Sequence, residues 1–441
     1  MGEAVRFYEL ARTSAADLVK MMSRTETDLS EFIEKVKPII RAVAVEGDEA
    51  LARFARDFDQ SPVSADQIKC SPEEFELAFE GFDPKVTEAI RFASESIRIF
   101  HERQMPEPMR LSELRPGVFC GERYLPIPSV ACYVPRGKGA FPSVLLMTVI
   151  PAVVAGVPRL AILTPPGPGG RVDAATLVAA RLAGAEDVYK CGGAQAVAAA
   201  AYGTRTVPKV DKIVGPGSPF VMAAKRLLAG VIDPGVPAGP SESIVLADET
   251  ADGRLAALDL IIESEHGPDS SAFLVTNSRI VAEAALAEIP RYWDRLGQTR
   301  REFSTAVLTG DKGGVVLARD MDEAIAFTND YAPEHLMIHS REPFRHLGRI
   351  TNAGEILLGE HTPISIGNYV LGPNAVLPTS GAARTYSPLT VFDYLKSTSV
   401  GYVTSTAYEE LAGHAHTLAV YEGFDGHALA VSGLRRELRR S

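Results

Sequence analysis

The middle of the chain alternates between short β-rich runs and longer runs in which apolar residues recur at helical spacing. The β-rich runs are 130–134, 160–164, 187–190 and 212–214. The runs with helical spacing are 143–156, 173–184, 194–203 and 219–230. Strands that alternate with helices in this way are typical of a parallel sheet covered by helices on both faces.

A second series of the same kind follows the Pro- and Gly-rich stretch 234–240. Its predicted strands are 243–247, 272–276, 306–309 and 314–317. The residues before about 120 instead carry charged helical patterns, and those after about 390 show two helical patterns without a strand rhythm. We therefore predict an α/β fold with two Rossmann-like parallel-sheet domains plus small helical N- and C-terminal segments.

Length and composition narrow the class of protein. The chain has 441 residues, too many for one ordinary core, and 46% of them are hydrophobic. A net charge of -11 and a pI near 5.4 argue against nucleic acid or an anionic membrane as the partner. The apolar stretch 144–157 contains Pro151 and is too short to span a bilayer, and no secretory signal is visible.

The cysteines indicate the compartment. They are widely spaced and form no C-x-x-C motif, which fits a reducing cytoplasm and gives neither a disulfide framework nor a thiolate metal site. We therefore expect a cytoplasmic protein. The cysteines are Cys70, Cys120, Cys132 and Cys191.

Glu263 and His266 are the first candidates for chemistry. They follow the apolar run 255–262 and precede Gly267-Pro268, so we expect them to close a helix. Side chains three residues apart lie on the same helix face. A carboxylate and an imidazole on that face supply two of the four ligands that zinc prefers.

Glu334 and His335 form a second candidate, because they lie at the boundary between a helical segment and a short apolar run. Adjacent Glu and His side chains can supply a general base and a proton shuttle. Taken alone, the pair fits a surface acid beside a half-buried histidine better than a catalytic pair.

Three glycine-rich segments fall at predicted strand-to-helix turns, where backbone amides can bind a phosphate or a nucleotide. None matches G-x-G-x-x-G with an acidic residue about twenty positions later, so tight βα turns are the alternative interpretation. The irregular stretch 359–381 is long enough to be an active-site loop. The glycine-rich segments are 135–139, 192–195 and 215–218.

Taken together, the motifs resemble those of histidinol dehydrogenase from about residue 30 to the C-terminus. The resemblance is specific because all the motifs occur in order. They are Val134-Pro-x-Gly-Lys138 with Pro142-Ser143 after it, Gly192-Gly-Ala-Gln-Ala196, Val214-Gly-Pro-Gly217, Ala238-Gly-Pro-Ser-Glu242, Glu265-His-Gly-Pro-Asp269, Ala332-Pro-Glu-His-Leu336, Gly372-Pro-Asn-Ala-Val-Leu-Pro-Thr379 and Glu422-Gly-x-x-x-His427.

The resemblance implies a zinc-dependent, NAD-using dehydrogenase that oxidises an amino alcohol through the aldehyde to the acid. It implies a homodimer in which a C-terminal segment completes the partner's active site. The implied domains are an N-terminal helical segment, a discontinuous first α/β domain, a cofactor-side second α/β domain and a C-terminal helical segment. Their ranges, in the same order, are 1–26, 27–132 with 243–389, 133–242, and 390–441.

The resemblance also assigns roles to individual residues. Glu334 would activate the water that attacks the aldehyde, and His335 would be the acid/base for the alcohol proton. The other implied residues are Tyr133, Gln195 and Ser218 for the cofactor, Ser241 and Glu422 for the substrate, and Glu263, His266, Asn368 and His427 for the metal.

Two of the metal positions depart from the family pattern in opposite directions. The family has Gln where Glu263 stands and Asp where Asn368 stands, so one amide and one carboxylate have exchanged places. Two imidazoles, one carboxylate and one amide oxygen would still surround the ion with the same total charge. We therefore favour a working zinc site over an inactive, metal-binding paralogue. Among the cofactor positions, Ser218 replaces the usual Asn.

Other departures concern the substrate. Ile364 replaces a family Glu, Ala375 replaces a family His, and Arg136 replaces a family Gly, so the pocket is less suited to a cationic amino alcohol. Arg136 would match a small anionic alcohol, or it would contact the cofactor phosphates. These changes resemble the branch that oxidises 2,3-dihydroxypropane-1-sulfonate to 3-sulfolactate. Histidinol or another small hydroxy compound is the alternative substrate.

Overall fold

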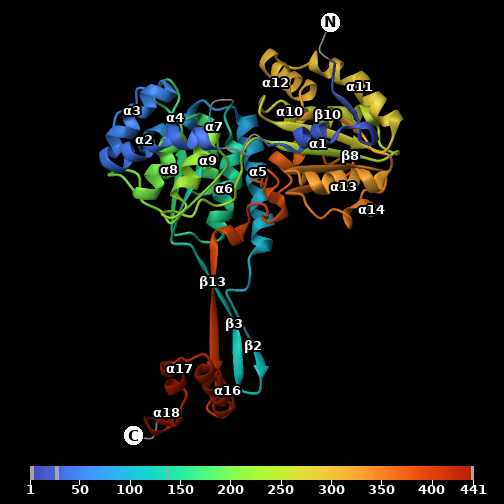
Figure 1. Cartoon of the computed structure of the whole chain (residues 1–441). Helices are drawn as coiled ribbons and strands as arrows, with labels where there is room; N and C mark the ends of the chain where they lie inside the picture. The colour runs from blue at the N-terminus through green and yellow to red at the C-terminus, as the bar shows by residue number, and fades with distance from the viewer. Residues whose placement is uncertain (1–3, 25–28, 137–138, 439–441) are drawn as a thin grey trace. The chain divides into compact units, whose positions relative to one another are not determined.

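The computed structural model describes residues 4–24, 29–136 and 139–438. The chain forms two compact units: residues 1–105 with 127–394, and residues 106–126 with 395–441. The first unit contains both parallel sheets, and the second contains the C-terminal residues (Figure 1).

The first series of predicted strands forms a four-stranded parallel sheet with the order β6-β5-β4-β7. The central strand β4 is buried throughout and pairs with a strand on each side, as expected for a sheet covered on both faces. The strands are β4 (Ser129–Tyr133), β5 (Arg159–Thr164), β6 (Val188–Lys190) and β7 (Lys212–Val214), and the helices that follow them are α6 (Pro142–Val154), α7 (Ala174–Ala183), α8 (Gly193–Tyr202) and α9 (Pro219–Leu228).

The second series forms a six-stranded parallel sheet with the order β1-β10-β9-β8-β11-β12. Apolar clusters lie on its two faces. The two parallel sheets confirm the predicted α/β fold. The strands are β1 (Phe7–Glu9), β8 (Glu242–Ala247), β9 (Ser271–Thr276), β10 (Gly313–Leu317), β11 (His335–His339) and β12 (Glu355–Leu358).

One predicted strand is wrong. Residues 306–309 are the last turn of a helix, α12, because the short apolar run continues the helical spacing that begins at Gln298. The helices around the six-stranded sheet are α10 (Gly253–Ser264), α11 (Arg279–Trp293), α12 (Gln298–Thr309), α13 (Met321–Tyr331), α14 (Phe344–Leu347) and α15 (Ile364–Tyr369), with the 3-10 turns Ala382–Arg384 and Val391–Asp393 after them.

The N-terminal residues pack differently from the expected domain ranges. Residues 27–132 were expected to join 243–389, but apolar side chains of α2 and α3 share one core with the four-stranded sheet and the alanine-rich α8. Residues 1–26 were expected as a separate segment, but β1 extends the six-stranded sheet and Met21 lies in its core. The helices here are α1 (Ala15–Met22), α2 (Ser30–Glu46), α3 (Asp48–Asp59), α4 (Pro72–Glu80) and α5 (Pro84–Gln104), with the 3-10 turn Leu10–Arg12 before them.

The second unit contains an antiparallel sheet, with the order β13-β3-β2, that the sequence pattern did not predict. Every residue of β2 is exposed, so no alternation of buried and exposed side chains marks it. The C-terminal segment therefore begins with a strand and is not wholly helical. The elements are β2 (Met109–Arg115), β3 (Val118–Pro126), β13 (Leu395–Val403), α16 (Tyr408–Tyr421), α17 (Asp425–Ala430) and α18 (Gly433–Leu438).

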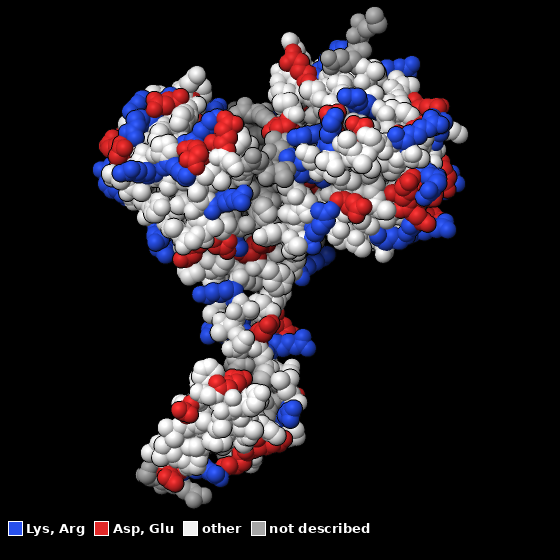
Figure 2. All heavy atoms as spheres, in the orientation of Figure 1, with Lys and Arg blue, Asp and Glu red and all other residues white. Residues whose placement is uncertain are grey.

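The surface carries both signs of charge. Lys and Arg side chains are interspersed with Asp and Glu on the face shown in Figure 2. That face therefore offers no broad basic surface to a polyanion. Among the described helices, none is both long enough and apolar enough to cross a membrane.

Candidate active site

One pocket of the first unit gathers half of the site residues predicted from the sequence. It lies at the amino ends of β8 and β11, because Ser241 precedes β8 and Glu334 precedes β11. The four-stranded part of the unit contributes Pro135, Phe141 and Pro216 to the same pocket. The predicted site residues that line it are Ser241, Glu263, His266, Glu334, His335 and Asn368.

Glu334 and His335 are both buried, with 6% and 3% of their surface exposed. The main-chain N–H of Glu242 donates to Glu334 Oε2 at 2.9 Å. The second oxygen, Oε1, lies 4.0 Å from His335 Nε2. His335 Nδ1 lies 3.0 Å from Oε2 of Glu355, the first residue of β12. The imidazole is therefore placed between two carboxylates, a geometry suited to proton transfer at Nε2.

The surroundings of the pocket raise the pKa of both Glu334 and His335. Burial raises the pKa of Glu334 well above its ordinary value, and repulsion from Glu263 adds to the rise. Burial alone would lower the pKa of His335, but Glu263, Glu334 and Glu355 outweigh it and raise that pKa to about 9. Perturbed titratable groups that converge in a cleft are typical of an active site.

Glu263 and Asn368, the two predicted metal ligands that differ from the family pattern, are in direct contact. Asn368 Nδ2 donates to Glu263 Oε1 at 3.1 Å, although 105 residues separate them in sequence. Asn368 lies on α15, and Glu263 lies in the last turn of α10, as predicted. The same hydrogen bond can form when the carboxylate stands at position 368 and the amide at position 263. The opposite substitutions at the two positions therefore have a local physical reason.

The same cluster fits a cation. Glu263 is only 1% exposed, and its Oε2 has no hydrogen-bond partner among the described residues. His266 follows the end of α10, where its Nδ1 lies 3.1 Å from the carbonyl oxygen of Ile262 and 3.3 Å from Glu263 Oε2. The contact with a main-chain carbonyl favours a proton on Nδ1 and leaves Nε2 as a possible ligand.

The electrostatics of Glu263 agree with an anionic ligand. Burial alone would raise its pKa, but the imidazoles of His266 and His335 outweigh burial and lower the pKa below its ordinary value. In the described part of the chain, no group of three or more His, Cys, Asp and Glu side chains is arranged to hold a metal. The cluster therefore supplies one carboxylate, one imidazole and one amide, and a full ligand set needs a further residue.

A second crevice lies at the carboxyl ends of β4 and β7. The strand order of this sheet reverses between β4 and β7, which is where open α/β sheets bind ligands. Gly215 follows β7 with φ +112°, and a Cβ there would lie 2.2 Å from the carbonyl oxygen of Tyr133. Ser218 is the N-cap of α9 and lines the crevice. The close approach of Tyr133 therefore requires glycine at 215, and the turn brings the N-terminus of α9 to the crevice.

The other predicted cofactor residues flank a neighbouring turn. The Gly193 N–H donates to the Tyr133 hydroxyl at 3.1 Å, and a Cβ on Gly193 would lie 2.7 Å from Gln195 Oε1. Gly193 begins α8 with φ +60°. Tyr133 and Gln195 are therefore adjacent in space. Gly137 and Lys138 of the first glycine-rich segment lie outside the described residues.

Arg136 does not line the pocket of Glu334. It lines the crevice with Ser218, and its guanidinium lies against Gly167 in the turn after β5. Asp59, at the end of α3, is near it. Burial raises the pKa of Asp59 to about 6, and Arg136 opposes the rise. The same crevice is lined by Ser218, a predicted cofactor contact, and by Ser241, a predicted substrate contact.

The six-stranded sheet has an equivalent switch point between β8 and β11, where a cavity is lined by polar side chains that include Asp248, Thr250 and Arg341. The N–H of Thr250 donates to Asp248 Oδ1 at 2.8 Å, and the N–H of Arg341 donates to Thr250 Oγ1 at 2.9 Å. No glycine lies between 248 and 250. The four-stranded sheet is therefore better built for a nucleotide.

Two predicted site residues lie on the second unit. Glu422 ends α16 and His427 lies on α17, and both are exposed. Their predicted roles in the substrate and metal sites stay predictions.

Three residues near the pockets were missed by sequence reasoning. Glu355 carries no motif and is recognised only by its contact with His335. Glu242 was visible as the last residue of Ala238-Gly-Pro-Ser-Glu242, but it occupies a strand and gave no chemical signal of its own. Asp59 lies more than seventy residues before the crevice that it approaches.

The comparisons with known proteins agree on one family. The family profile "Histidinol dehydrogenase" matches residues 22–435. A "Histidinol dehydrogenase homolog" of Cereibacter sphaeroides is 63% identical over 98% of this chain and 98% of its own. A "Histidinol dehydrogenase" of Synechocystis is 47% identical over 97% of this chain and 98% of its own.

A solved structure extends the match to the fold. The crystal structure of histidinol dehydrogenase from Elizabethkingia anophelis superposes with a TM-score of 0.93 at 30% identity and covers 100% of both chains. The profile spans the four-stranded sheet, the six-stranded sheet except β1, and most of the second unit. The chain therefore belongs to the histidinol dehydrogenase family.

Proposed function

We propose that this protein is a zinc-dependent, NAD-linked dehydrogenase that oxidises a small alcohol through the aldehyde to the carboxylate. The observation that carries the proposal is one pocket that holds the buried Glu334 and His335 beside the Glu263–Asn368 pair. The first two side chains suit acid–base chemistry, and the second pair suits a cation.

Zn²⁺ would be held by Glu263, His266 and Asn368, with His427 as the fourth ligand. When bound, it would polarise the carbinol or carbonyl oxygen and so favour loss of the alcohol proton. The burial of Glu263 supports this assignment, because it is 1% exposed and a buried carboxylate is stabilised by a neighbouring positive charge.

NAD would bind in the crevice of the four-stranded sheet, with Tyr133, Gln195 and Ser218 as contacts, and would accept the hydride in each oxidation. Ser218, the N-cap of α9, lines this crevice, and a helix N-terminus favours the phosphates of a nucleotide.

In its neutral form, His335 would take the proton of the alcohol at Nε2 during the first oxidation, while Glu355 holds the ring through Nδ1. Glu334 would then take a proton from the water that attacks the aldehyde carbon. Each alcohol loses two hydrides to two NAD molecules, and the water supplies the second carboxylate oxygen. Ser241, which lines the same pocket, would bind the substrate.

We propose a cytoplasmic homodimer in which Glu422 and His427 come from the partner subunit. The need for a fourth ligand beyond the described cluster supports this. The location is supported by four free cysteines, which suit a reducing compartment.

For the substrate we propose 2,3-dihydroxypropane-1-sulfonate, oxidised to 3-sulfolactate. Ala375 lines the pocket where the resemblance expects an imidazole, and Ile364 is fully buried in an apolar cluster where it expects a carboxylate. Both changes remove polar partners for histidinol. The relative at 63% identity is named a homolog, whereas the histidinol dehydrogenase of Synechocystis is 47% identical. Histidinol is the second candidate, because the catalytic pair is intact.

A substrate screen tests the function. We expect NADH to form with dihydroxypropanesulfonate, with two NADH per alcohol, and to form poorly with histidinol. A chelator is expected to stop the reaction, and added Zn²⁺ to restore it. Rapid turnover of histidinol would contradict the proposed substrate. A lack of NADH with every alcohol tested would contradict the enzyme assignment and favour an inactive paralogue.

We infer that Arg300 binds the sulfonate of the substrate and that Arg136 binds the phosphates of NAD, and a matched pair of substitutions tests the two assignments. Arg300 of α12 lines a cavity that shares His266 and Tyr369 with the catalytic pocket, whereas Arg136 lines the cofactor crevice. We expect Arg300→Met to raise KM for the sulfonate substrate by about 10- to 100-fold, the loss of one hydrogen bond to a charged group. Arg136→Met is expected to raise KM for NAD instead.

Propane-1,2-diol, which lacks the sulfonate, is the control substrate for these measurements, and Arg300→Met should leave its KM nearly unchanged. A change in KM for NAD in Arg300→Met, or for the sulfonate in Arg136→Met, would reverse the assignment.

A further inference from the structure

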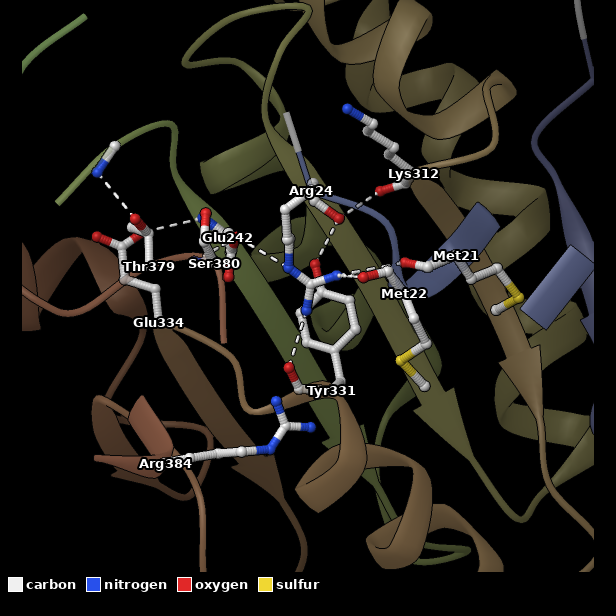
Figure 3. A network of polar contacts seen from close by, with 12 residues as sticks. Met21, Met22, Arg24, Glu242, Lys312, Tyr331, Glu334, Thr379, Ser380 and Arg384 are labelled. Atoms are coloured by element: carbon white, nitrogen blue, oxygen red, sulfur yellow. Dashed lines mark hydrogen bonds and ion pairs between the residues drawn. The ribbon is translucent and has the colours of Figure 1, made fainter. Parts of the chain in front are cut away.

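The N-terminal segment places a buried arginine behind Glu334. Arg24 follows α1, and its side chain is only 8% exposed. Its guanidinium lies over the ring of Tyr331 at 3.5 Å from the centroid (Figure 3). Nη2 donates to the carbonyl oxygen of Tyr331 at 2.8 Å, and Nη1 donates to that of Met22 at 2.8 Å. These contacts fix the plane of the guanidinium.

Arg24 forms an ion pair with Glu242. Its Nε lies 2.9 Å from Glu242 Oε1, and the Glu242 side chain is 4% exposed. The same oxygen accepts the Ser380 N–H at 2.9 Å. Burial raises the pKa of Glu242, and Arg24 opposes that rise. Removal of one partner from a buried ion pair leaves an uncompensated charge, so the position of Glu242 depends on Arg24.

Glu242 in turn holds Glu334, because its main-chain N–H donates to Glu334 Oε2. The oxygen that remains, Oε1, is the one near His335. A chain of contacts thus runs from Arg24 through Glu242 to one oxygen of Glu334 (Figure 3).

The backbone around these residues is strained. Ser380, which contacts Glu242, has φ +58°, and Ala332, two residues before Glu334, has φ +52°. Left-handed conformations of residues other than glycine are costly and cluster at functional sites. The surrounding contacts therefore impose a particular backbone geometry next to Glu334.

We propose that Arg24 and Glu242 are positioning residues that set the orientation of Glu334, and that they affect the oxidation of the aldehyde more than that of the alcohol. The inference rests on the proposed function, in which only the aldehyde step uses Glu334 to activate water. A small displacement of such a group is enough to slow its step by about 100-fold.

The test measures the two oxidations separately in the full-length protein. The alcohol step is followed as NADH release in the presence of an aldehyde trap, and the aldehyde step starts from the aldehyde of dihydroxypropanesulfonate. Arg24→Met is expected to lower kcat of the aldehyde step by about 10- to 100-fold and to leave the alcohol step nearly unchanged. Arg24→Lys keeps the charge without the planar fork and should restore part of the rate.

Arg53→Met is the matched control, because Arg53 also has an ion pair, with Glu46, and an aromatic contact, with Phe54, on a helix that carries neither catalytic residue. It should change neither step. If Arg24→Met reduces the yield of folded protein, the ratio of the two steps is measured in Arg24→Lys.

Two outcomes would count against the proposal in different ways. Equal losses in the two steps would show that Arg24 supports only the fold and would contradict the positioning role. If the unchanged enzyme performs neither oxidation, the proposed function fails and the positioning role fails with it.

Discussion

Glu334→Gln is expected to stop the reaction at the aldehyde. The substitution keeps the shape of the side chain and an oxygen for the Glu242 N–H, but it removes the base that accepts a proton from water. General-base catalysis contributes about 100- to 10,000-fold, so kcat for aldehyde oxidation should fall by that factor. The alcohol step should survive, because its proton goes to His335. One NADH per alcohol, in place of two, is the expected stoichiometry.

The same variant tests the pH dependence. Glu334 accepts a proton only when it is ionised, and burial with repulsion from Glu263 raises its pKa. The rate of aldehyde oxidation should therefore rise with pH through the raised pKa and fall as pH decreases. Glu334→Gln should lose this dependence. The measurement is the pH–rate profile of aldehyde oxidation for the unchanged enzyme and for Glu334→Gln.

Glu249→Gln is the control for the change of charge. Glu249 lies after the carboxyl end of β8, and its carboxylate accepts a hydrogen bond from Asn277 at 2.9 Å. Glu334 lies at the opposite end of that sheet. Glu249→Gln should keep two NADH per alcohol. Full aldehyde oxidation in Glu334→Gln would contradict the role of Glu334 as the base.

The fold could be predicted from the sequence where a run of apolar residues marks a buried element. The strands β4 and β8 are buried at every position, and their apolar runs marked both parallel sheets. The strand β2 is exposed at every position, so the antiparallel sheet left no such pattern. The packing of α2 and α3 on the four-stranded sheet depends on contacts between distant segments, which local spacing does not encode.

The candidate site likewise contains residues whose association local spacing could predict and residues whose association it could not. Glu334 and His335 are neighbours in sequence, so their association could be predicted. Glu263 lies in the last turn of α10 as expected, but His266 follows the C-cap of that helix and not its last turn. Glu355 and Arg24 reach the site through strand pairing and tertiary packing, and neither stands in a motif. The exchange of Glu263 and Asn368 was visible only because the resemblance supplied the usual residues, and the structure adds the 3.1 Å contact between them.

We expect the contact between Glu263 and Asn368 to make zinc binding depend on both side chains together. Glu263→Gln removes the only carboxylate of the cluster that contains His266 and Asn368, and we expect zinc affinity to fall at least as far as the 10- to 100-fold loss typical of outer-shell changes. Asn368→Asp alone would place two carboxylates at hydrogen-bond distance in a buried site. Without metal they repel each other by on the order of a few kcal/mol, so the metal-free variant should have a lower Tm.

The double variant, Glu263→Gln with Asn368→Asp, restores one carboxylate and one amide in the reverse order. We expect its zinc content and its metal-free Tm to return toward those of the unchanged protein, which is strong coupling between residues in contact. Zinc per subunit after dialysis against a graded chelator and the Tm of the chelated protein are the measurements, and neither depends on knowing the substrate.

Glu249 and Asn277 provide the matched control, because they form the same carboxylate–amide hydrogen bond, 2.9 Å long, outside the pocket. Their exchange should change neither zinc content nor Tm by much, since Glu249 is solvated. If the double variant at 263 and 368 binds no more zinc than Glu263→Gln alone, the two positions do not form one charge-conserving metal site. Recovery would mean that the metal chemistry tolerates either order of the pair, so selection on the substrate pocket could act without loss of the metal.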